Sequence, residues 1–531
     1  MNKIKSTCEL KQAMDGGMVP VVTRGADTFR LGSLYNGRYA ASRWIEGHVE
    51  ERMEHAILFG LGDLQIVLQL LRKIPGYVLV YEPDPAIYHA VRQSVLFSKF
   101  RNEEKLYILY GGEDQYNPLG DLITDILNDD CVERTAVLTH PGYVTRYPEQ
   151  YEMLMEICQK VCDAIGFTQG ALQRHMKIMV DNQLDNVKYL KGAIPVARLA
   201  KYWDSEVPVI LVAAGPSLKK NIQYLKQVKG KAFVFAADTA LPMLLHNGVV
   251  PDLVGSTDGL KQMKCFAEQG SFDIPYMICS STKNEIVRQL TNKKIWTYDH
   301  AMVRILFERH GIENSRIPAQ FGIATGLFAM MMELGVKTIV FVGQDLAYSE
   351  DKQTHAEDNG ESFSEAKAVL VDGYDGGQVY SRPDWNKFRE WFENMIPILP
   401  KDWRVINATE GGAKITGTIQ KTLKEVVEEL PDRGACFEDI INDDRVRISD
   451  REYQGIMSDW KHARTELEKV KREGYRKTFF EMDYRNMPIM DMVMGYMRYL
   501  KDVPEREDRF DQAVNYIYEQ ILLREKLGGE E

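Results

Sequence analysis

Three short apolar runs between positions 209 and 258 each end in small, hydroxyl or acidic residues. The residues at these ends are Gly215, Pro216, Ser217, Asp238, Thr239 and Asp258. Short apolar runs of this kind are typical of buried parallel strands, and open α/β sheets bind their ligands at the carboxyl ends of the strands. The pattern therefore predicts a nucleotide site.

The segment Gly215-Pro216-Ser217 joins the first predicted strand to a predicted helix. Glycine allows close backbone approach, and proline suits the first turn of a helix because its missing N–H would be unpaired there in any case. The free amides and the dipole of a helix N-terminus favour a phosphate, to which Ser217 could add a hydroxyl. The segment lacks the Gly-Lys-Ser/Thr of a Walker loop, so P-loop NTPase chemistry is disfavoured.

Acidic residues end the second and third runs. Asp238, followed by Thr239, stands where a carboxylate commonly binds a ribose hydroxyl. Asp258 ends the third run, and for this residue the alternative is a helix cap or a turn, roles that aspartate often fills. Three polar strand ends in succession favour a ligand site more strongly than any one of them does.

A second group of candidate residues lies further downstream. Thr325 stands at the predicted start of an apolar helix, among small residues that again allow close approach. The predicted strand at 338–342 is followed by Gln344, Asp345 and Tyr348, and then by His355 in a polar loop. A lone histidine in a polar loop is usually a surface residue. Because this loop is long enough to act as a lid beside a strand-end aspartate, a catalytic role for His355 is an equal alternative.

The first part of the chain contains half of another nucleotide-binding pattern. A predicted strand at 55–59 leads into Gly60-Leu61-Gly62, and the next predicted strand ends in Glu82. This resembles a dinucleotide or S-adenosylmethionine site. Gln65 stands where the third glycine is expected. We therefore favour a structural interpretation, in which the glycines only make a tight strand-to-helix turn.

The composition is that of an ordinary soluble protein. The 531 residues are 44% hydrophobic and 27% charged, which suits about three domains of ~150 residues each. The net charge of −11 argues against nucleic acid as a partner. The first residues lack the apolar core of a signal peptide, no run has the length of a membrane helix, and the seven cysteines are scattered. We therefore expect a cytoplasmic protein with no membrane span.

The order of predicted elements divides the chain into three regions. Strands and helices alternate in residues 1–190 and again in residues 200–420, whereas residues 430–531 show apolar residues at helical spacing among dense charge. We predict an α/β fold with an N-terminal Rossmann-like α/β domain that ends in a bridging helix. A central Rossmann-like domain and a C-terminal all-α domain follow.

Two aromatic or methionine-rich segments have a structural and a functional interpretation. The segment 482–499 predicts either a helical core filled by flexible methionines, which we favour, or an adaptable surface for a partner protein. A predicted helix carries Trp385, Phe388, Trp391 and Phe392. We expect these aromatic side chains to pack in the core rather than to stack on a base.

Five motifs of the central region occur in a set order: Gly-Pro-Ser-Leu, Ala-Asp-Thr-Ala-Leu, Val-Val-Pro-Asp-Leu-Val-Gly-Ser-Thr-Asp, Gly-Gln-Asp-Leu-Ala-Tyr with a following His, and Asn-Ala-Thr-Glu-Gly-Gly-Ala. This ordered set resembles the motility associated factor (Maf) flagellin glycosyltransferases over residues 200–420. The resemblance implies a central domain of the bacterial sialyltransferase type. It also implies transfer of a nonulosonic acid, such as pseudaminic or legionaminic acid, from its CMP-activated form to Ser or Thr of flagellin, in support of flagellar assembly and motility.

The resemblance assigns roles to the candidate residues. The substrate-binding set is Gly215, Pro216, Ser217, Asn221, Asp238, Thr239, Asp258, Thr325 and Gln344. Within it, Gly215, Ser217 and Thr325 are candidates for stabilising the phosphate of the leaving CMP, and Asp238 and Asn221 for holding ribose or cytosine.

The implied catalytic set is His355, Asp345 and Tyr348. The acceptor hydroxyl needs a base as it attacks an oxocarbenium-like centre. By analogy with the sialyltransferases we prefer His355, with Asp345 as the alternative, and Tyr348 is a phenolic donor to the phosphate. No divalent-metal motif is compelling, so we expect no cofactor beyond the donor, and the sequence leaves the need for a metal open.

Two alternatives stay open at this point. The central region also resembles archaeal 6-hydroxymethylpterin diphosphokinases, which would bind ATP and Mg²⁺ and would use Asp238, Asp258 and Asp345 as metal ligands. That function would leave the first and third regions with no task. The other alternative is a flagellin-binding factor that is not an enzyme.

Overall fold

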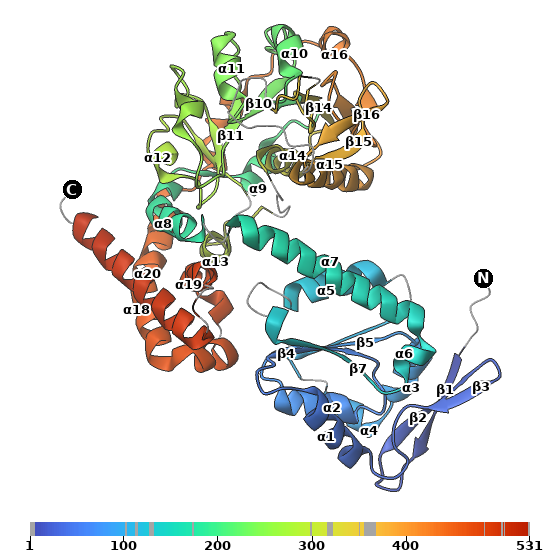
Figure 1. The fold of residues 1–531 in the computed structure, drawn as a ribbon. Helices are drawn as coiled ribbons and strands as arrows, with labels where there is room; N and C mark the ends of the chain where they lie inside the picture. Colours follow the sequence, from blue (N-terminus) through green and yellow to red (C-terminus); the bar gives the residue numbers. More distant parts are fainter. Residues whose placement is uncertain are drawn as a thin grey trace. The chain divides into compact units, whose positions relative to one another are not determined.

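The computed structural model in Figure 1 describes most of the chain. The described residues are 6–100, 103–111, 115–126, 132–172, 175–297, 300–315, 322–349, 351–354, 368–482, 484–500, 503 and 505–528. The chain forms two compact units, Met1–Arg174 and His175–Glu531. The second unit contains both the predicted central region and the predicted C-terminal helical region.

The first unit combines a small antiparallel sheet with a parallel one (Figure 1). The antiparallel strands are β1 (Ser6–Gln12), β2 (Met18–Arg24) and β3 (Asp27–Arg30), and the parallel ones are β4 (His55–Phe59), β5 (Val78–Glu82), β6 (Leu106–Tyr110) and β7 (Thr135–Thr139). The helices are α1 (Gly37–His48), α2 (Gln65–Lys73), α3 (Pro85–Val91), α4 (Val95–Ser98), α5 (Tyr116–Ile126), α6 (Tyr143–Arg146) and α7 (Pro148–Leu172).

The parallel strands of the first unit have the order β6-β5-β4-β7. This is the arrangement of half a Rossmann fold, with its topological switch point between β4 and β7. All residues of β4 and β5 are buried, as expected for apolar strands covered on both faces. The Rossmann-like α/β prediction for this part of the chain is confirmed.

The second unit is built on a larger sheet. Among the described residues its strand order is β18-β17-β14-β9-β10-β11-β12-β13-β8, and every pairing is parallel. The strands are β8 (Ile194–Pro195), β9 (Val209–Val212), β10 (Phe233–Ala237), β11 (Leu253–Gly255), β12 (Tyr276–Ile278), β13 (Lys294–Trp296), β14 (Thr338–Val342), β17 (Arg404–Asn407) and β18 (Ile419–Gln420). A separate hairpin consists of β15 (Val369–Asp372) and β16 (Gln378–Ser381).

Helices cover both faces of this sheet (Figure 1). They are α8 (Met176–Asn186), α9 (Val196–Leu199), α10 (Leu218–Leu225), α11 (Leu241–His246), α12 (Asn284–Val287), α13 (Ala301–Arg309), α14 (Ile323–Leu334), α15 (Pro383–Met395), α16 (Leu423–Glu429) and α17 (Phe437–Ile441). Alternate residues of β9 separate two cores: Val209 and Leu211 pack with α14 and α15, whereas Ile210 and Val212 pack with α10 and α16. Because β10 and β14 lie on opposite sides of β9, the topological switch point falls between β9 and β14.

The C-terminal region is helical, as predicted, and consists of α18 (Asp450–Glu481), α19 (Pro488–Tyr499) and α20 (Arg506–Gly528). Its core is continuous with that of the sheet, since Met490, Met492 and Met497 share one buried cluster with Trp296 of β13. These methionines therefore fill a core and are not available as a partner-binding surface. None of the described helices has the length and apolar character to cross a membrane.

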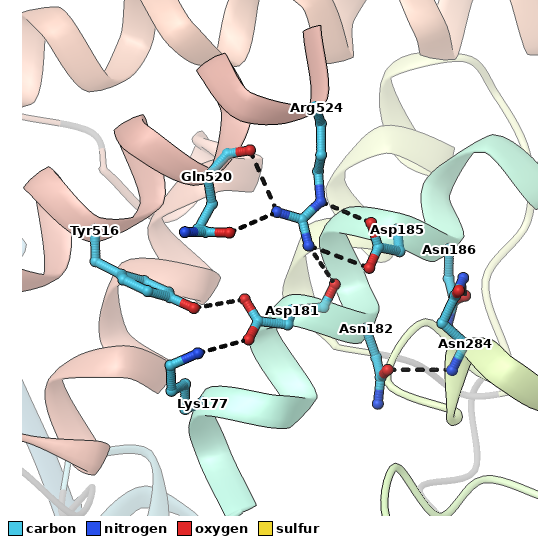
Figure 2. A network of polar contacts seen from close by, with 9 residues as sticks. All are labelled: Lys177, Asp181, Asn182, Asp185, Asn186, Asn284, Tyr516, Gln520 and Arg524. Carbon is cyan, nitrogen blue, oxygen red and sulfur yellow. Dashed lines mark hydrogen bonds and ion pairs between the residues drawn. The ribbon is translucent and has the colours of Figure 1, made fainter. Parts of the chain in front are cut away.

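A polar network ties the last helix of the second unit to its first helix (Figure 2). Arg524 of α20 donates from Nε and Nη2 to the two carboxylate oxygens of Asp185, at 2.7 and 3.1 Å. Tyr516 donates to Asp181 at 2.7 Å, and Lys177 donates to the other oxygen of the same carboxylate at 2.9 Å. The bonds from Arg524 and Tyr516 hold α20 against α8, and the Lys177–Asp181 pair lies within α8 itself.

The opposite side of α8 holds two loops of the sheet. Asn186 is fully buried, and its amide donates to the carbonyls of Ser280 and Thr282 at 2.8 and 2.6 Å. Asn182, one turn earlier, donates to the carbonyls of Gly259 and Ser281, both at 3.2 Å. Helix α8 thus fixes the segments that follow β11 and β12.

The replacement Asn186→Ala should lower the free energy of unfolding by about 2–3 kcal/mol, because it leaves two buried carbonyls without their donor. Asn292→Ala is the matched control, since the amide of Asn292 makes an exposed bond to the carbonyl of Asp273 and its loss should cost well under 1 kcal/mol. Denaturant unfolding measures both values. Equal losses in the two variants would contradict the assignment of Asn186 as a buried support.

Candidate functional site

A pocket opens at the carboxyl ends of β9, β10 and β14, next to the topological switch point. It has an empty volume of about 630 Å³, part of it open to solvent. Its lining residues are Ala213, Ala214, Gly215, Ala237, Thr239, Gly322, Ile323, Ala324, Thr325, Gly343, Gln344, Asp345, Leu346, Ala347, Thr354, Trp385 and Phe388. Open α/β sheets place their ligands in this position, so the pocket is the candidate site.

Two glycines let the strand ends approach one another closely. A Cβ atom on Gly215 would lie 1.9 Å from the carboxylate oxygen Oδ2 of Asp345, and one on Gly343 would lie 2.3 Å from the carbonyl oxygen of Ala213. Gly343 also has a φ of +65°, which disfavours other residues. The glycines of the two motifs are therefore required by contacts within the chain.

Asp345 caps the helix that was predicted to bind a phosphate. Its Oδ1 accepts a hydrogen bond from the backbone N–H of Ser217 at 3.1 Å, and its Oδ2 accepts one from the Ser217 hydroxyl at 2.7 Å. The residue is 5% exposed, and burial raises the pKa of Asp345 to about 6. The N-terminus of α10 is thus occupied by a carboxylate of the chain itself, which would repel a phosphate at the same place.

A second helix N-terminus faces the pocket. Helix α14 begins at Ile323, and residues 322–325 line the pocket. The first turn of α14 contains no acidic residue, so its dipole favours an anionic group. Thr325 is buried and its hydroxyl donates to the carbonyl of Gly322 at 2.7 Å. Of the two predicted anion positions, the one on α14 has the more suitable surroundings.

Gln344 lines the pocket and has unused hydrogen-bonding capacity. Its backbone N–H donates to the hydroxyl of Thr409 at 3.2 Å. Its side chain is buried, and among the described residues its Oε1 has no hydrogen-bond partner. Leaving a buried acceptor unpaired is costly, so this atom is suited to accept a hydrogen bond from a ligand.

An aromatic wall, made of Trp385 and Phe388 near the start of α15, forms another side of the pocket. The ring of Tyr348 lies 5.2 Å from that of Trp385. The prediction that all four aromatic residues of α15 are core residues is therefore wrong for these two, whereas Trp391 and Phe392 are in the core. The spacing does not distinguish them, because residues 385, 388 and 392 share one helix face and only Phe392 of the three belongs to the buried core.

Five residues of the predicted substrate-binding set lie outside the pocket lining. Two of them, Pro216 and Ser217, directly follow the lining residue Gly215, and the hydroxyl of Ser217 donates to Asp345. The other three are Asn221, Asp238 and Asp258. Asn221 is buried and its amide donates to the carbonyls of residues 408 and 409, both at 3.1 Å, which supports that loop. The Asp238 carboxylate is 1% exposed, and burial raises its pKa. It pairs with Lys261 at 2.5 Å and accepts a hydrogen bond from Ser256 at 2.7 Å.

Asp258 lies at the surface, and its Oδ1 accepts a hydrogen bond from the N–H of Leu260 at 2.8 Å. This is the turn role named above as the alternative. Lys261 was not predicted, because no sequence motif contains it. Ligand contacts by Asn221, Asp238 and Asp258 are not supported by this geometry, since their side chains serve other parts of the chain.

The remaining predicted catalytic residues lie close to the pocket or outside the described residues. Tyr348 is half-buried beside the aromatic wall. His355 lies outside the described residues, and Thr354, directly before it, lines the pocket. Within the described part of the chain, no group of three His, Cys, Asp or Glu residues is placed to hold a metal ion.

Replacing Asp345 by asparagine tests the buried carboxylate. Because its pKa is raised from 3.8 to about 6 in the folded chain, the fold favours the neutral form, and the stability that this group contributes is lost as pH rises from about 4 to about 6. The advantage of the wild-type chain over Asp345→Asn should therefore fall by up to about 3 kcal/mol across that window, at 1.36 kcal/mol per pKa unit. Denaturant unfolding at several pH values measures it. Asp258→Asn, at an exposed strand end, is the control, and parallel pH profiles for wild type and Asp345→Asn would refute the burial of the charge.

The comparisons with known proteins agree with this architecture. Residues 181–351 match the family described as 6-hydroxymethylpterin diphosphokinase MptE-like. An uncharacterised protein of Treponema pallidum (strain Nichols) is 26% identical over 112 residues, which are 21% of this chain. The match spans about half the length of that relative, 52%.

A solved structure extends the similarity to almost the whole chain. It is the structure of a Maf glycosyltransferase from Magnetospirillum magneticum AMB-1, which aligns with a TM-score of 0.58 and 16% sequence identity. The alignment covers 97% of this chain and 90% of that chain. The resemblance to the Maf glycosyltransferases is therefore confirmed as a shared fold, which includes the N-terminal α/β unit and the C-terminal helices.

Proposed function

We propose that this protein is a glycosyltransferase that moves a nonulosonic acid from its CMP-activated form to Ser or Thr hydroxyls of flagellin in the cytoplasm, in support of flagellar assembly. One observation carries the proposal. The pocket lies at the switch point of the large sheet, in a chain that shares its fold with a Maf glycosyltransferase over 97% of its length. Three of the five motifs that carry the resemblance supply residues to the lining of this pocket: Gly-Pro-Ser-Leu through Gly215, Ala-Asp-Thr-Ala-Leu through Thr239, and Gly-Gln-Asp-Leu-Ala-Tyr through Gln344 and Asp345.

The walls of the pocket suit the parts of a CMP-sugar. The N-terminus of α14 offers its dipole to the phosphate, and the Thr325 hydroxyl lies in the same turn. The aromatic wall offers flat faces to the pyrimidine base, an interaction worth about 1–3 kcal/mol per base. Gln344 offers an unpaired acceptor for the exocyclic amine of cytosine or for a sugar hydroxyl.

We place the chemistry at the side of the pocket that Thr354 lines. His355 follows Thr354 directly, and it would take the proton of the acceptor hydroxyl as that oxygen attacks the anomeric carbon. The bond from the anomeric carbon to the CMP phosphate breaks, and the α14 amides and the Tyr348 hydroxyl would stabilise the leaving phosphate. Asp345 is a positioning residue in this scheme, because both its oxygens are engaged by Ser217. The scheme uses no cofactor besides the donor.

The match to the diphosphokinase family supports a second candidate function. Such an enzyme would bind ATP and a pterin and would use strand-end carboxylates on a metal ion. In this chain Asp238 pairs with Lys261 and Asp345 with Ser217, so both carboxylates already have partners within the fold. We therefore rank this function second, and the binding experiment below includes its ligands.

The proposed function predicts which ligand the pocket binds. CMP should bind the purified chain in isothermal titration calorimetry, and Trp385→Ala should weaken that binding about 5- to 100-fold through loss of stacking. Trp385→Phe should retain most of the affinity, because it keeps an aromatic face. Gln344→Ala should weaken binding less, through one hydrogen bond. Binding of ATP together with 6-hydroxymethylpterin, but not of CMP, would favour the diphosphokinase instead.

The proposed function also predicts which residue is needed to transfer the sugar to flagellin. His355→Ala should abolish attachment of the nonulosonic acid to flagellin, measured by mass spectrometry of flagellin from cells that carry only the variant, while CMP binding persists. His246→Ala, on a different part of the second unit, is the control and should transfer normally. Transfer that survives His355→Ala would remove this residue from the mechanism. Loss of transfer after treatment with EDTA and recovery with a divalent metal would contradict the scheme without a cofactor.

A further inference from the structure

The first unit contains the frame of a nucleoside site. Strand β4 leads into Gly60-Leu61-Gly62 and then into α2, and Glu82 ends the neighbouring strand β5. The strand order β6-β5-β4-β7 puts these residues at the edge where a Rossmann fold binds its ligand. In that fold the glycine loop approaches the phosphates, and an acidic residue about 20 positions later binds a ribose hydroxyl.

A tyrosine occupies the place of the ribose hydroxyl. The hydroxyl of Tyr143 donates to Oε2 of Glu82 at 2.6 Å and accepts a hydrogen bond from the N–H of Gly62 at 3.0 Å. It therefore makes both bonds that a ribose hydroxyl would make between this loop and this acid. The remaining bonds of Glu82 come from the N–H groups of Leu61 and Asp84, both at 2.9 Å. Glu82 and Tyr143 are both fully buried.

Two rings fill the space into which the glycine loop opens. A Cβ atom on Gly60 would lie 2.5 Å from the ring of Tyr143, and one on Gly62 would lie 2.0 Å from Nε2 of His140. The close approach that these glycines permit is therefore used by the chain's own side chains. Burial lowers the pKa of His140 to about 4, so its ring is neutral near pH 7 and adds no charge for a phosphate.

The third ligand position, the N-terminus of α2, is occupied by a carboxylate. Oδ1 of Asp63 accepts a hydrogen bond from the N–H of Gln65 at 3.1 Å. This side chain is 8% exposed. A phosphate at the same helix end would meet its negative charge. Each of the three positions at which a nucleotide would contact a Rossmann fold is thus occupied by a residue of the chain. Tyr143 takes the place of the ribose hydroxyl, His140 fills the space beside the glycine loop, and Asp63 occupies the N-terminus of α2.

We propose that the first unit carries a nucleoside site that its own Tyr143, His140 and Asp63 keep filled, so that nucleotide binding is confined to residues 175–531. The class of ligand that fits the frame is the ribose of an uncharged nucleoside, because Glu82 can accept from its hydroxyls while Asp63 disfavours phosphate. The inference does not depend on which ligand binds the second unit. It accounts for a glycine loop and a strand-end acid that have no task in the proposed transfer.

A second tyrosine–carboxylate hydrogen bond lies next to the one between Tyr143 and Glu82. Tyr147, four residues after Tyr143, donates to Oδ2 of Asp84 at 2.9 Å. Gly142 starts this stretch with a φ of +84°, which disfavours other residues. The two tyrosines therefore hold the carboxylates of Glu82, at the end of β5, and of Asp84, two residues later, and removal of Tyr143 alone leaves the second pair to keep the segment in place.

The test uses the full chain and adenosine as the probe. Tyr143→Ala vacates the ribose position and Tyr143→Phe removes only the hydroxyl. Tyr107→Ala, which truncates a partly exposed tyrosine elsewhere in the first unit, is the matched control. Calorimetry measures adenosine binding, and 8-azidoadenosine with peptide mapping identifies the labelled segment. Circular dichroism and thermal unfolding establish that each variant is folded.

We expect no adenosine binding and no labelled peptide between residues 55 and 147 in the wild type, in Tyr143→Phe or in Tyr107→Ala. A folded Tyr143→Ala chain should bind adenosine at least about tenfold more tightly than the wild type, with label in that segment. Labelling of the segment in the wild type would overturn the proposal, and so would a folded Tyr143→Ala chain that gains no binding. If Tyr143→Ala does not fold, the smaller truncation Tyr143→Leu takes its place, with the same expected and contradicting outcomes.

Discussion

The pocket of the second unit depends on one buried carboxylate. Asp345 joins the segment after β14 to the segment after β9 through two hydrogen bonds from Ser217. Its backbone carbonyl accepts the N–H of Ala413 at 2.7 Å and so brings in a third segment. Gly215 and Gly412 are needed because a Cβ at either position would collide with Asp345. The walls that line the pocket are therefore set by a buried carboxylate, whose pKa is raised by burial against the opposing effects of the Ser217 bonds and of Lys220.

The two units use similar strand ends in opposite ways. In the first unit, burial raises the pKa of Glu82 to about 8, and a tyrosine hydroxyl completes its set of donors. In the second unit, Asp345 draws its donors from the adjacent strand end, and the space beyond it stays open as a pocket. A third carboxylate, Asp238, pairs with Lys261, the arrangement that compensates a buried charge most directly. A carboxylate at the end of a strand thus serves either packing or ligand binding. The outcome depends on which groups donate hydrogen bonds to it.

Sequence patterns predicted the positions of the strands well, but they did not predict which side chains contact each other at the strand ends. The strands at 55–59 and 338–342 agree with β4 and β14 residue for residue, because buried apolar runs bounded by glycine have few other solutions. The contact of Ser217 with Asp345 joins positions 128 residues apart, and that of Tyr143 with Glu82 joins positions 61 apart. Local periodicity contains no information on such pairs. The division of α15 between core and pocket depends on where the sheet ends, which its helical spacing does not encode.

The hydrogen bonds between α8 and α20 join the two ends of the second unit, and this determines which part of the unit can form last. Asp185 is synthesised 339 residues before Arg524, so α8 leaves the ribosome long before the helix that secures it exists. The loops after β11 and β12 are held by α8 as well, because the side-chain amides of Asn182 and Asn186 donate to their carbonyls. Contacts over so large a separation form late, because loop closure must precede them. That edge of the sheet is therefore completed only after α20 has been translated, and a chain truncated before α20 would lack the contacts that secure α8.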